Sequence, residues 1–168
     1  ESDSSYEGGI LSHKSATFTY DGENDFIFYG TSYDKRKRTK IDQKYIKMQG
    51  RKVYEFALKN VPVAMKSCFD EADCKIEDLK KIFIHQANQK MDEAIINRFF
   101  KLYKLSAPKD ILPMNIEEFG NSSVATIPTL FDLVKKTNYK GHKLSVGDII
   151  MFASVGAGMN INAITYKV

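Results

Sequence analysis

The chain has 168 residues, of which 43% are hydrophobic, and this is enough for one domain with a sizeable core. Its 25 lysines and arginines outnumber its 21 aspartates and glutamates, but the net charge of +4 is too small to indicate a nucleic-acid partner by itself. Two cysteines exclude a disulfide framework, and no apolar run is long enough to cross a bilayer, so we expect a cytoplasmic protein without a membrane partner.

The amino terminus is acidic and polar, shows no signal peptide and does not begin with methionine, so we expect a processed product or a fragment. The three histidines, His13, His85 and His142, are scattered along the chain. The spacing of Cys68 and Cys74 matches no common zinc motif. We therefore predict no metal site.

The first 70 residues predict two strands followed by a long helix. β-Branched and aromatic residues indicate strands at residues 8–20 and 26–29. The polar and strongly charged segment 33–44 is typical of a surface loop. Apolar residues then recur at helical spacing over residues 53–68, and Pro62 inside this pattern predicts a kink or the start of a second helix.

The middle of the chain predicts a buried strand, a helix and a further strand. Residues 81–84 are short and apolar, as in a buried parallel strand. Residues 89–105 have apolar side chains on one helical face, and residues 114–119 favour a strand.

The last third predicts one helix and a closing hairpin. Ser122 or Ser123 can cap the helix, and Pro128 should set its true start or bend it. The apolar segment 149–153 and the alternating segment 160–168 are separated by glycines, which indicates two strands joined in a hairpin.

Strands that alternate with helices indicate a layered α/β domain. We predict a single domain, residues 1–168, with helices layered around a five-stranded mixed sheet. The closing hairpin would contribute an antiparallel strand.

Three polar or glycine-rich turns each stand beside an apolar segment. They are His85-Gln86-Ala87-Asn88, Gly120-Asn121-Ser122-Ser123 and Gly156-Ala157-Gly158. In α/β sheets, ligands bind beyond the carboxyl ends of the strands, so these turns could converge at one edge of the sheet. A lone histidine after a strand is usually a core or capping residue, and it is the combination of three turns that indicates a site.

These motifs resemble the C-terminal half of β-ketoacyl-acyl carrier protein synthase III. The likeness includes all three turns, the continuation Val124-Ala125-Thr126-Ile127-Pro128, and Gly147-Asp148. Lys47-Met48-Gln49-Gly50 with Val53-Tyr54 also resembles the segment before the family's first long helix. The resemblance implies one half of a thiolase-like fold, in which two similar α/β halves pack back to back. The nucleophilic cysteine would belong to the other, N-terminal half.

The family reaction is a decarboxylating Claisen condensation of an acyl group from coenzyme A with malonyl-acyl carrier protein. Loss of carbon dioxide places negative charge on the thioester oxygen, so a hydrogen-bond donor aimed at that oxygen lowers the barrier. The resemblance implies that His85 and Asn121 are the two catalytic donors. It also implies that the backbone N–H of Gly158 contributes to an oxyanion hole, where a side chain would block the approach of the substrate.

Four further positions match supporting positions of the family. Asn88 matches a residue that orders the site, and Lys90 stands where many members have an arginine that docks the carrier protein. Lysine keeps the charge but lacks the bidentate fork of arginine. Gly50 and Tyr54 match a segment that borders the substrate tunnel. No cofactor is implied, because acyl-CoA and malonyl-acyl carrier protein are both substrates.

The resemblance implies an acyltransferase of fatty acid or related lipid and polyketide synthesis, active only as part of the full-length protein. The expected partners are acyl carrier protein, acyl-CoA, the N-terminal half of the same protein and, when full length, a second copy in a homodimer. The acyl primer and the pathway stay open. Plant-type polyketide synthases share the histidine and asparagine, although the His85-Gln86-Ala87-Asn88 turn fits the bacterial carrier-protein branch better.

The alternative is a non-catalytic half-domain that binds carrier protein or a partner chain. Cys68 lies on an apolar helical face and Cys74 lies in a charged loop without a base, so neither is expected to be the nucleophile. The basic tract Lys35-Arg36-Lys37-Arg38-Thr39-Lys40 is interpreted as a solvated loop, with attraction of acidic carrier protein or coenzyme A phosphates as another interpretation. Its few interleaved aromatic residues argue against single-stranded nucleic acid, and we predict no nucleic-acid partner.

Overall fold

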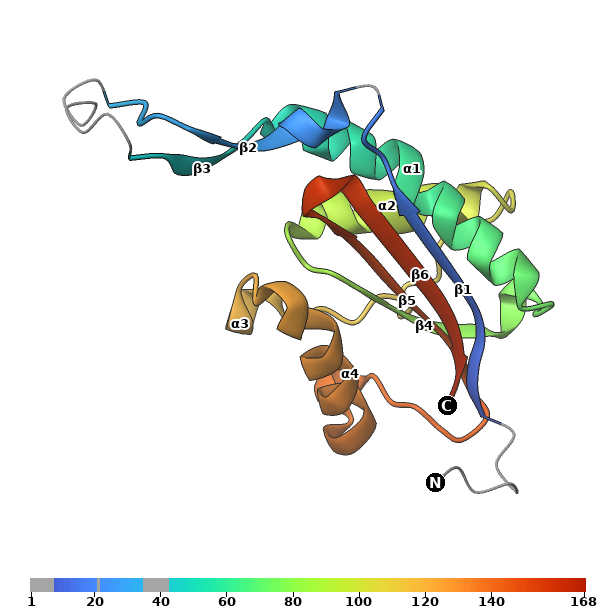
Figure 1. Cartoon of the computed structure of the whole chain (residues 1–168). Helices are drawn as coiled ribbons and strands as arrows, with labels where there is room; N and C mark the ends of the chain where they lie inside the picture. The colour runs from blue at the N-terminus through green and yellow to red at the C-terminus, as the bar shows by residue number, and fades with distance from the viewer. Residues whose placement is uncertain (1–7, 21, 35–42) are drawn as a thin grey trace.

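The computed structural model describes residues 8–20, 22–34 and 43–168 (Figure 1). Its centre is a four-stranded mixed sheet, which confirms the predicted α/β class, the parallel strand and the closing hairpin. In chain order the strands are β1 (Gly9–Thr17), β4 (Leu79–Ile84), β5 (Ile149–Gly156) and β6 (Asn160–Lys167). Their order across the sheet is β1-β6-β5-β4. β4 and β5 are parallel, whereas β6 is antiparallel to both of its neighbours.

Each face of the sheet has its own apolar core, because successive side chains of a strand point to opposite faces. The larger core lies beneath helices α1 (Gly50–Glu71) and α2 (Gln89–Lys101) and includes Met151 of β5. The smaller core lies beneath helix α4 (Thr126–Thr137) and includes Phe152, the next residue of β5. The sheet is therefore the middle layer between α1 with α2 on one side and α4 on the other (Figure 1).

Helix α1 continues through Pro62, so the proline does not begin a second helix. A proline has no N–H, and Pro62 therefore leaves the carbonyl oxygen of Leu58 without its usual helical donor. The guanidinium of Arg98 in α2 donates a hydrogen bond to this oxygen at 2.9 Å. The neighbouring helix thus replaces the missing donor, and α1 keeps its length.

The expectation of a fifth strand was wrong, because residues 114–119 form a loop and the short helix α3 (Ile116–Phe119). The preceding residues still follow the outer edge of β4, where the backbone N–H of Ile82 donates to the carbonyl oxygen of Ile111 at 2.8 Å. Pro108 and Pro113 flank this contact and cannot donate to a ladder. The segment therefore takes the place of an edge strand without forming a regular one.

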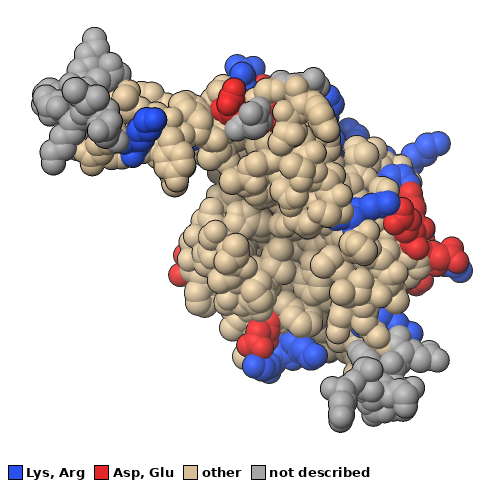
Figure 2. Space-filling view, viewed as in Figure 1, with Lys and Arg blue, Asp and Glu red and all other residues tan. Residues whose placement is uncertain are grey.

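A two-stranded antiparallel ribbon, formed by β2 (Ile27–Gly30) and β3 (Tyr45–Met48), projects from the body of the protein (Figure 1). β2 confirms the second predicted strand. The basic tract at residues 35–40 lies outside the described residues. In the space-filling view, charged side chains lie mainly at the margins, and the middle of this face is uncharged (Figure 2).

The start of α4 differs from the predicted serine cap. A turn of 3-10 helix at Ser123–Ala125 precedes α4, and neither Ser122 nor Ser123 makes a capping bond to the helix backbone. Pro128 falls in the first turn of α4, where backbone N–H groups lack helical acceptors and a proline is tolerated. Among the helices in the described part of the chain, none is long and apolar enough to span a membrane.

Candidate active site

His85 lies directly beyond the end of β4, where the parallel pairing with β5 continues for one more residue. Its backbone N–H donates to the carbonyl oxygen of Ala153 at 3.0 Å, so the sheet fixes the backbone that carries the imidazole. The side chain is half-buried. Burial lowers the pKa of His85 from 6.5, and a hydrogen bond to the backbone of Ser123 partly opposes this by favouring the protonated ring. The imidazole is therefore neutral at pH 7.

A pocket of about 370 Å³ opens beside His85 and brings the three predicted turns together. Ser123 and Val124 line it from the 3-10 turn before α4, and Gly156 and Ala157 line it from the turn between β5 and β6. The predicted convergence at one edge of the sheet is thus confirmed. The complete lining consists of His85, Ser123, Val124, Ile127, Ser154, Val155, Gly156, Ala157, Asn160 and Asn162.

Asn121 stands two residues before this lining, in a turn with an unusual backbone. Gly120 has φ 62° and ψ −158°, a conformation essentially restricted to glycine, and it directs the chain into the turn. The side-chain oxygen of Asn121 accepts a hydrogen bond from the backbone N–H of Ser123 at 2.9 Å. This bond engages the oxygen of the carboxamide and leaves its NH₂ group as the end that can donate to a ligand.

Gly158 lies in the turn after β5, next to Ala157 of the pocket, but does not line the pocket itself. Its φ of 74° is a left-handed conformation that favours glycine. A β-carbon at this position would have no atom of the described chain within 4 Å. The backbone conformation, rather than crowding within this chain, is therefore what requires glycine here.

The sequence interpretation missed two asparagines of the pocket. Asn160 and Asn162 alternate in β6 and so point to the same face of the sheet. The NH₂ group of Asn162 donates to the carboxamide oxygen of Asn160 at 2.5 Å, and Asn160 donates to the hydroxyl of Thr17 at 2.8 Å. Their spacing of two, directly after a glycine turn, is the sequence signal that would have placed them in the site.

Asn88 and Lys90 lie at the start of α2 and do not line the His85 pocket. Asn88 is the N-cap residue, and its side-chain oxygen accepts a hydrogen bond from the backbone N–H of Met91 at 3.2 Å. Such a cap satisfies one of the unpaired donors at a helix start. Lys90 is exposed in the first turn, so its charge is accessible from solvent.

Gly50 and Tyr54 occupy the first two turns of α1, at the base of the projecting ribbon. Gly50 is the first residue of the helix, and the side chain of Tyr54 is 40% exposed. Neither residue lines the His85 pocket. The structure therefore separates these two positions from the polar site within this chain.

Gln86 is a third residue to which the sequence interpretation assigned no role, although it belongs to the His85 turn. Its side chain is fully buried, and both ends of the amide are hydrogen-bonded to the backbone of a distant loop. Its NH₂ group donates to the carbonyl oxygen of Pro113 at 3.1 Å, and its oxygen accepts from the N–H of Asn115 at 3.0 Å. The residue after His85 thus ties the histidine turn to the segment that leads to Asn121.

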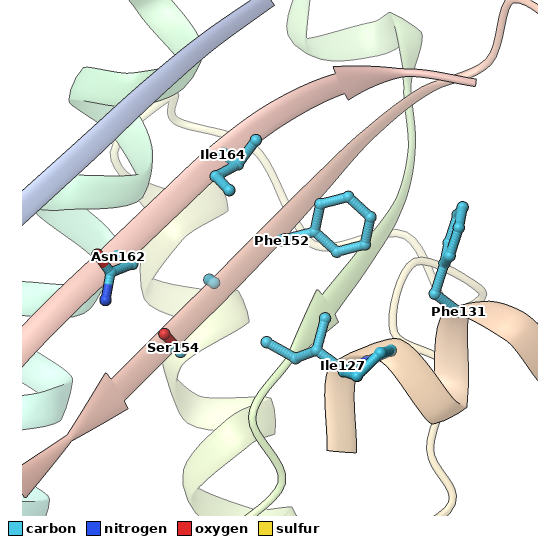
Figure 3. Close-up of a pocket in the computed structure, with 8 residues that line it drawn as sticks. Ile127, Phe131, Phe152, Ser154, Asn162 and Ile164 are labelled. Carbon is cyan, nitrogen blue, oxygen red and sulfur yellow. The ribbon is translucent and has the colours of Figure 1, made fainter. Parts of the chain in front are cut away.

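An apolar pocket of about 340 Å³ adjoins the polar one (Figure 3). Phe131 and Ile127 of α4 form one side, and Phe152 and Ile164 of the sheet form the other (Figure 3). Ser154 and Asn162, like Ile127, line both pockets, so the two are continuous. The site therefore combines a polar end with an apolar surface on the α4 side of the sheet.

Neither cysteine lies in the His85 pocket. Cys68 is buried in α1, where its carbonyl oxygen accepts from Ser12 and its thiol donates to the carbonyl oxygen of Ala163. Burial, together with nearby Asp78 and Asp73, raises the pKa of the Cys74 thiol and keeps it protonated. A thiolate nucleophile for this pocket would have to come from outside the described residues.

The pocket offers hydrogen-bond donors but has few charged groups. A neutral imidazole, the carboxamides of β6 and the nearby Asn121 can stabilise negative charge on an oxygen. Among the described residues, no three His, Cys, Asp or Glu side chains gather as they do around a metal ion. The arrangement suits a reaction in which charge develops on a carbonyl oxygen.

Residues 69–168, more than half of the chain, match the family described as 3-Oxoacyl-[acyl-carrier-protein (ACP)] synthase III C terminal. A β-ketoacyl-[acyl-carrier-protein] synthase III of Porphyra umbilicalis is 34% identical over 122 residues, which cover 73% of this chain and 34% of that protein. The corresponding protein of Prochlorococcus marinus is 33% identical over 118 residues, which cover 70% and 32% respectively. The chain spans about a third of the length of these curated relatives.

Solved structures of similar fold cover nearly the whole chain. The 3-oxoacyl-[acyl-carrier-protein] synthase III of Aquifex aeolicus superposes with a TM-score of 0.73 at 23% identity, over 99% of this chain and 47% of that one. The enzyme of Pseudomonas aeruginosa gives a TM-score of 0.75 at 19% identity, over 99% and 46%. The fold is thus thiolase-like, and the chain belongs to the family of 3-oxoacyl-(acyl-carrier-protein) synthase III C-terminal domains.

Proposed function

We propose that this chain is the C-terminal catalytic half of a 3-oxoacyl-(acyl-carrier-protein) synthase III, which condenses an acyl-CoA primer with malonyl-acyl carrier protein. The observation that carries the proposal is the convergence of His85, the turn after Asn121 and the Gly156-Ala157 turn around one pocket, in a chain of this family. The reaction belongs to fatty acid or related lipid synthesis, and the whole protein acts as an acyltransferase.

In the proposed mechanism, His85 and Asn121 stabilise the enolate that forms when the malonyl group loses carbon dioxide. The electrons of the broken carbon–carbon bond move onto the thioester oxygen, and donors aimed at that oxygen lower the barrier. The neutral His85 donates a ring N–H to that oxygen. Asn121 donates through its NH₂ group, because the side-chain oxygen is engaged by Ser123.

The enolate carbon then attacks the acyl group carried on a cysteine thiol. The carbonyl oxygen of that acyl group becomes an oxyanion, for which the backbone N–H of Gly158 is the proposed donor from this chain. The left-handed turn at Gly158 supports this role, because it places a backbone without a side chain beside the pocket. Collapse of the tetrahedral intermediate releases the cysteine thiolate and the 3-oxoacyl product.

The cysteine and a covering surface are proposed to come from an N-terminal half of the same protein. Two observations support this: the chain spans about a third of the curated relatives, and the pocket beside Phe152 and Ile164 is open and apolar. A surface of this kind is typical of a protein interface. Full-length protein is further proposed to form a homodimer.

Substrate delivery is proposed to use the N-terminal ends of α1 and α2. Lys90 is exposed at the start of α2 and would attract the acidic acyl carrier protein, with Asn88 fixing that helix start. Gly50 and Tyr54 at the start of α1 are proposed to border the tunnel for the pantetheine arm. Acyl-CoA and malonyl-acyl carrier protein are both substrates, and no cofactor is proposed.

The test of this proposal is condensation by the intact protein. Full-length protein with the cysteine-bearing half should form an acyl-enzyme from acyl-CoA and release carbon dioxide from malonyl-acyl carrier protein, while this chain alone should do neither. A native gene product no longer than this chain, or full-length protein that binds carrier protein without either reaction, would favour the non-catalytic alternative.

A further inference from the structure

We propose that Gln86 is a positioning residue that sets where the Asn121 turn stands relative to His85. The inference rests on the proposed function, because it concerns the two donors assigned there. Gln86 does not line the His85 pocket and is fully buried, so it would act only through the residues that it holds.

The side-chain amide of Gln86 anchors a loop. The side chain is 0% exposed, and it bridges the carbonyl oxygen of Pro113 (3.1 Å) and the N–H of Asn115 (3.0 Å). A buried amide is costly to leave unsatisfied, so a side chain with both ends bonded strongly favours one position of its partner loop. Gln86 therefore fixes the segment 113–115.

A short hydrogen-bonded path leads from Asn115 to Asn121. The carbonyl oxygen of Asn115 accepts hydrogen bonds from the N–H groups of Glu118 and Phe119, both at 3.0 Å. The N–H of Gly120 then donates to the carbonyl oxygen of Ile116 at 2.9 Å. These bonds make α3 a single compact turn, and a displacement of Asn115 would be transmitted to the residue after Gly120.

The histidine side of the bridge is held by the sheet. His85 and Gln86 are consecutive, and His85 is held to β5 by its bond to Ala153. The Asn121 side has a second attachment, since Lys140 lies 3.1 Å from Glu118 of α3. That ion pair is partly exposed and is expected to contribute little. The buried Gln86 bridge should therefore hold the segment before α3 more strongly than this ion pair does.

Two donors that act on one oxygen must be placed accurately. A misplacement of about 1 Å at a catalytic group can cost about 10²-fold in rate. Loss of the Gln86 bridge should therefore affect the step that uses both His85 and Asn121, which is decarboxylation. Acyl transfer to the cysteine should depend on it much less.

The experiment compares Gln86→Met with Lys81→Met in the full-length protein. Methionine has a similar length but cannot make the two hydrogen bonds. Lys81 is the matched control, because it is also buried, and its amino group donates to the carbonyl oxygen of Asp110 in the same connection at 2.5 Å. Acyl-enzyme formation is measured by intact mass, and decarboxylation by release of carbon dioxide from malonyl-acyl carrier protein.

We expect Gln86→Met to lower decarboxylation by about 10²-fold while acyl-enzyme formation changes little. Lys81→Met should leave the ratio of the two rates unchanged, even though it lowers stability. The inference would be overturned if Gln86→Met lowered both rates equally. It would also be overturned if Lys81→Met lowered decarboxylation, relative to acyl-enzyme formation, as much as Gln86→Met does. Gln86 would then be a purely structural residue.

Gln86→Glu provides a second variant that retains the shape of the side chain. A protonated carboxyl can donate to Pro113 and accept from Asn115, whereas a carboxylate would face the carbonyl oxygen of Pro113 without a proton to share. The decarboxylation rate of Gln86→Glu, relative to the unchanged protein, should therefore rise as the pH falls. If the decarboxylation rate of Gln86→Glu divided by that of the unchanged protein did not depend on pH, the proposed bridge would be contradicted.

Hydrogen exchange separates this inference from the proposed function. The amides of Asn115, Gly120 and Ser123 should exchange faster in Gln86→Met than in Lys81→Met, whether or not the protein catalyses condensation. If the unchanged protein shows neither reaction, the proposed function fails while the exchange result still tests the bridge. Unchanged exchange at these three amides would overturn the positioning role.

Discussion

Arg98 of α2 donates a hydrogen bond to the carbonyl oxygen of Leu58 in α1, which is the oxygen that Pro62 leaves without a helical donor. The two helices are thereby joined at the turn where proline interrupts the backbone ladder. A buried carbonyl without a donor is unfavourable, so this contact explains how one long helix accommodates the proline.

Arg98→Met should lower the free energy of unfolding by about 1 kcal/mol, because it removes this donor. The cost should shrink in a Pro62→Ala background, where the alanine N–H can reach the carbonyl oxygen of Leu58 within the helix. Urea unfolding of the four proteins in the double-mutant cycle measures the coupling. An Arg98→Met cost that is equal in both backgrounds would show that the arginine does not replace the missing donor.

Asp92 gives the protein an unusual dependence on pH. The residue is fully buried, and neither carboxyl oxygen has a hydrogen-bond partner among the described residues. Burial, with a smaller effect from Glu93, raises the pKa of Asp92 from 3.8 to about 8. The folded protein therefore binds one more proton than the unfolded chain between these two values, and stability falls as pH rises through that window.

Asp92→Asn should remove this pH dependence, which amounts to about 1.4 kcal/mol for each pH unit within the window. The stability of Asp92→Asn minus that of the unchanged protein should be larger at pH 7.5 than at pH 5. Thermal unfolding of both intact proteins at the two pH values measures this difference. Glu93→Gln, at the exposed neighbouring position, is the matched control and should change the slope much less. Identical slopes for Asp92→Asn and the unchanged protein would contradict the buried, protonated carboxyl.

Gly158 and Gly147 provide a test of the oxyanion role. Both have left-handed backbones, and an added β-carbon would meet no atom within 4 Å at either site. Alanine at either position should therefore cost about 1–2 kcal/mol of stability through backbone strain alone. Only Gly158→Ala should also reduce the rate of condensation by the full-length protein. Equal activity of the two variants at saturating substrate would remove Gly158 from the mechanism.

The apolar surface beside α4 should make the isolated chain self-associate. Ile164 and Phe152 are only partly buried there and face an open pocket (Figure 3). Ile164→Lys should weaken the association, whereas Ile10→Lys, at a residue 66% exposed on β1, should not. Sedimentation velocity over a range of concentrations measures both. A monomer at every concentration would argue against a surface that needs a covering half.

Hydrophobic patterning predicted much of this fold, because the buried strands and helices carry apolar residues at regular spacing. The apolar run at Ile82, Phe83 and Ile84 is buried between two cores, and its burial on both faces is what made it readable as a parallel strand. The prediction failed at residues 114–119, where apolar residues are interrupted by Glu117 and Glu118 in the first turn of a helix. Local propensity did not distinguish that turn from an edge strand.

The candidate site was predicted only where polar residues stand in recognisable turns. His85 and the glycine turns were found, because polar residues directly after apolar segments are conspicuous in sequence. Gln86 was missed, because its importance depends on hydrogen bonds to a loop 27 residues away, which no local pattern encodes. Asn160 and Asn162 were missed because alternating polar residues in a strand usually indicate an exposed face.

In the proposed mechanism, His85 and Asn121 act together on the thioester oxygen during decarboxylation. The most direct measurement compares His85→Ala and Asn121→Ala in the full-length protein, with acyl-enzyme formation and carbon dioxide release followed separately. Each variant should lose about 10²–10³-fold in carbon dioxide release, while acyl transfer to the cysteine is much less affected. Equal losses in both steps, or decarboxylation that survives either substitution, would contradict the account.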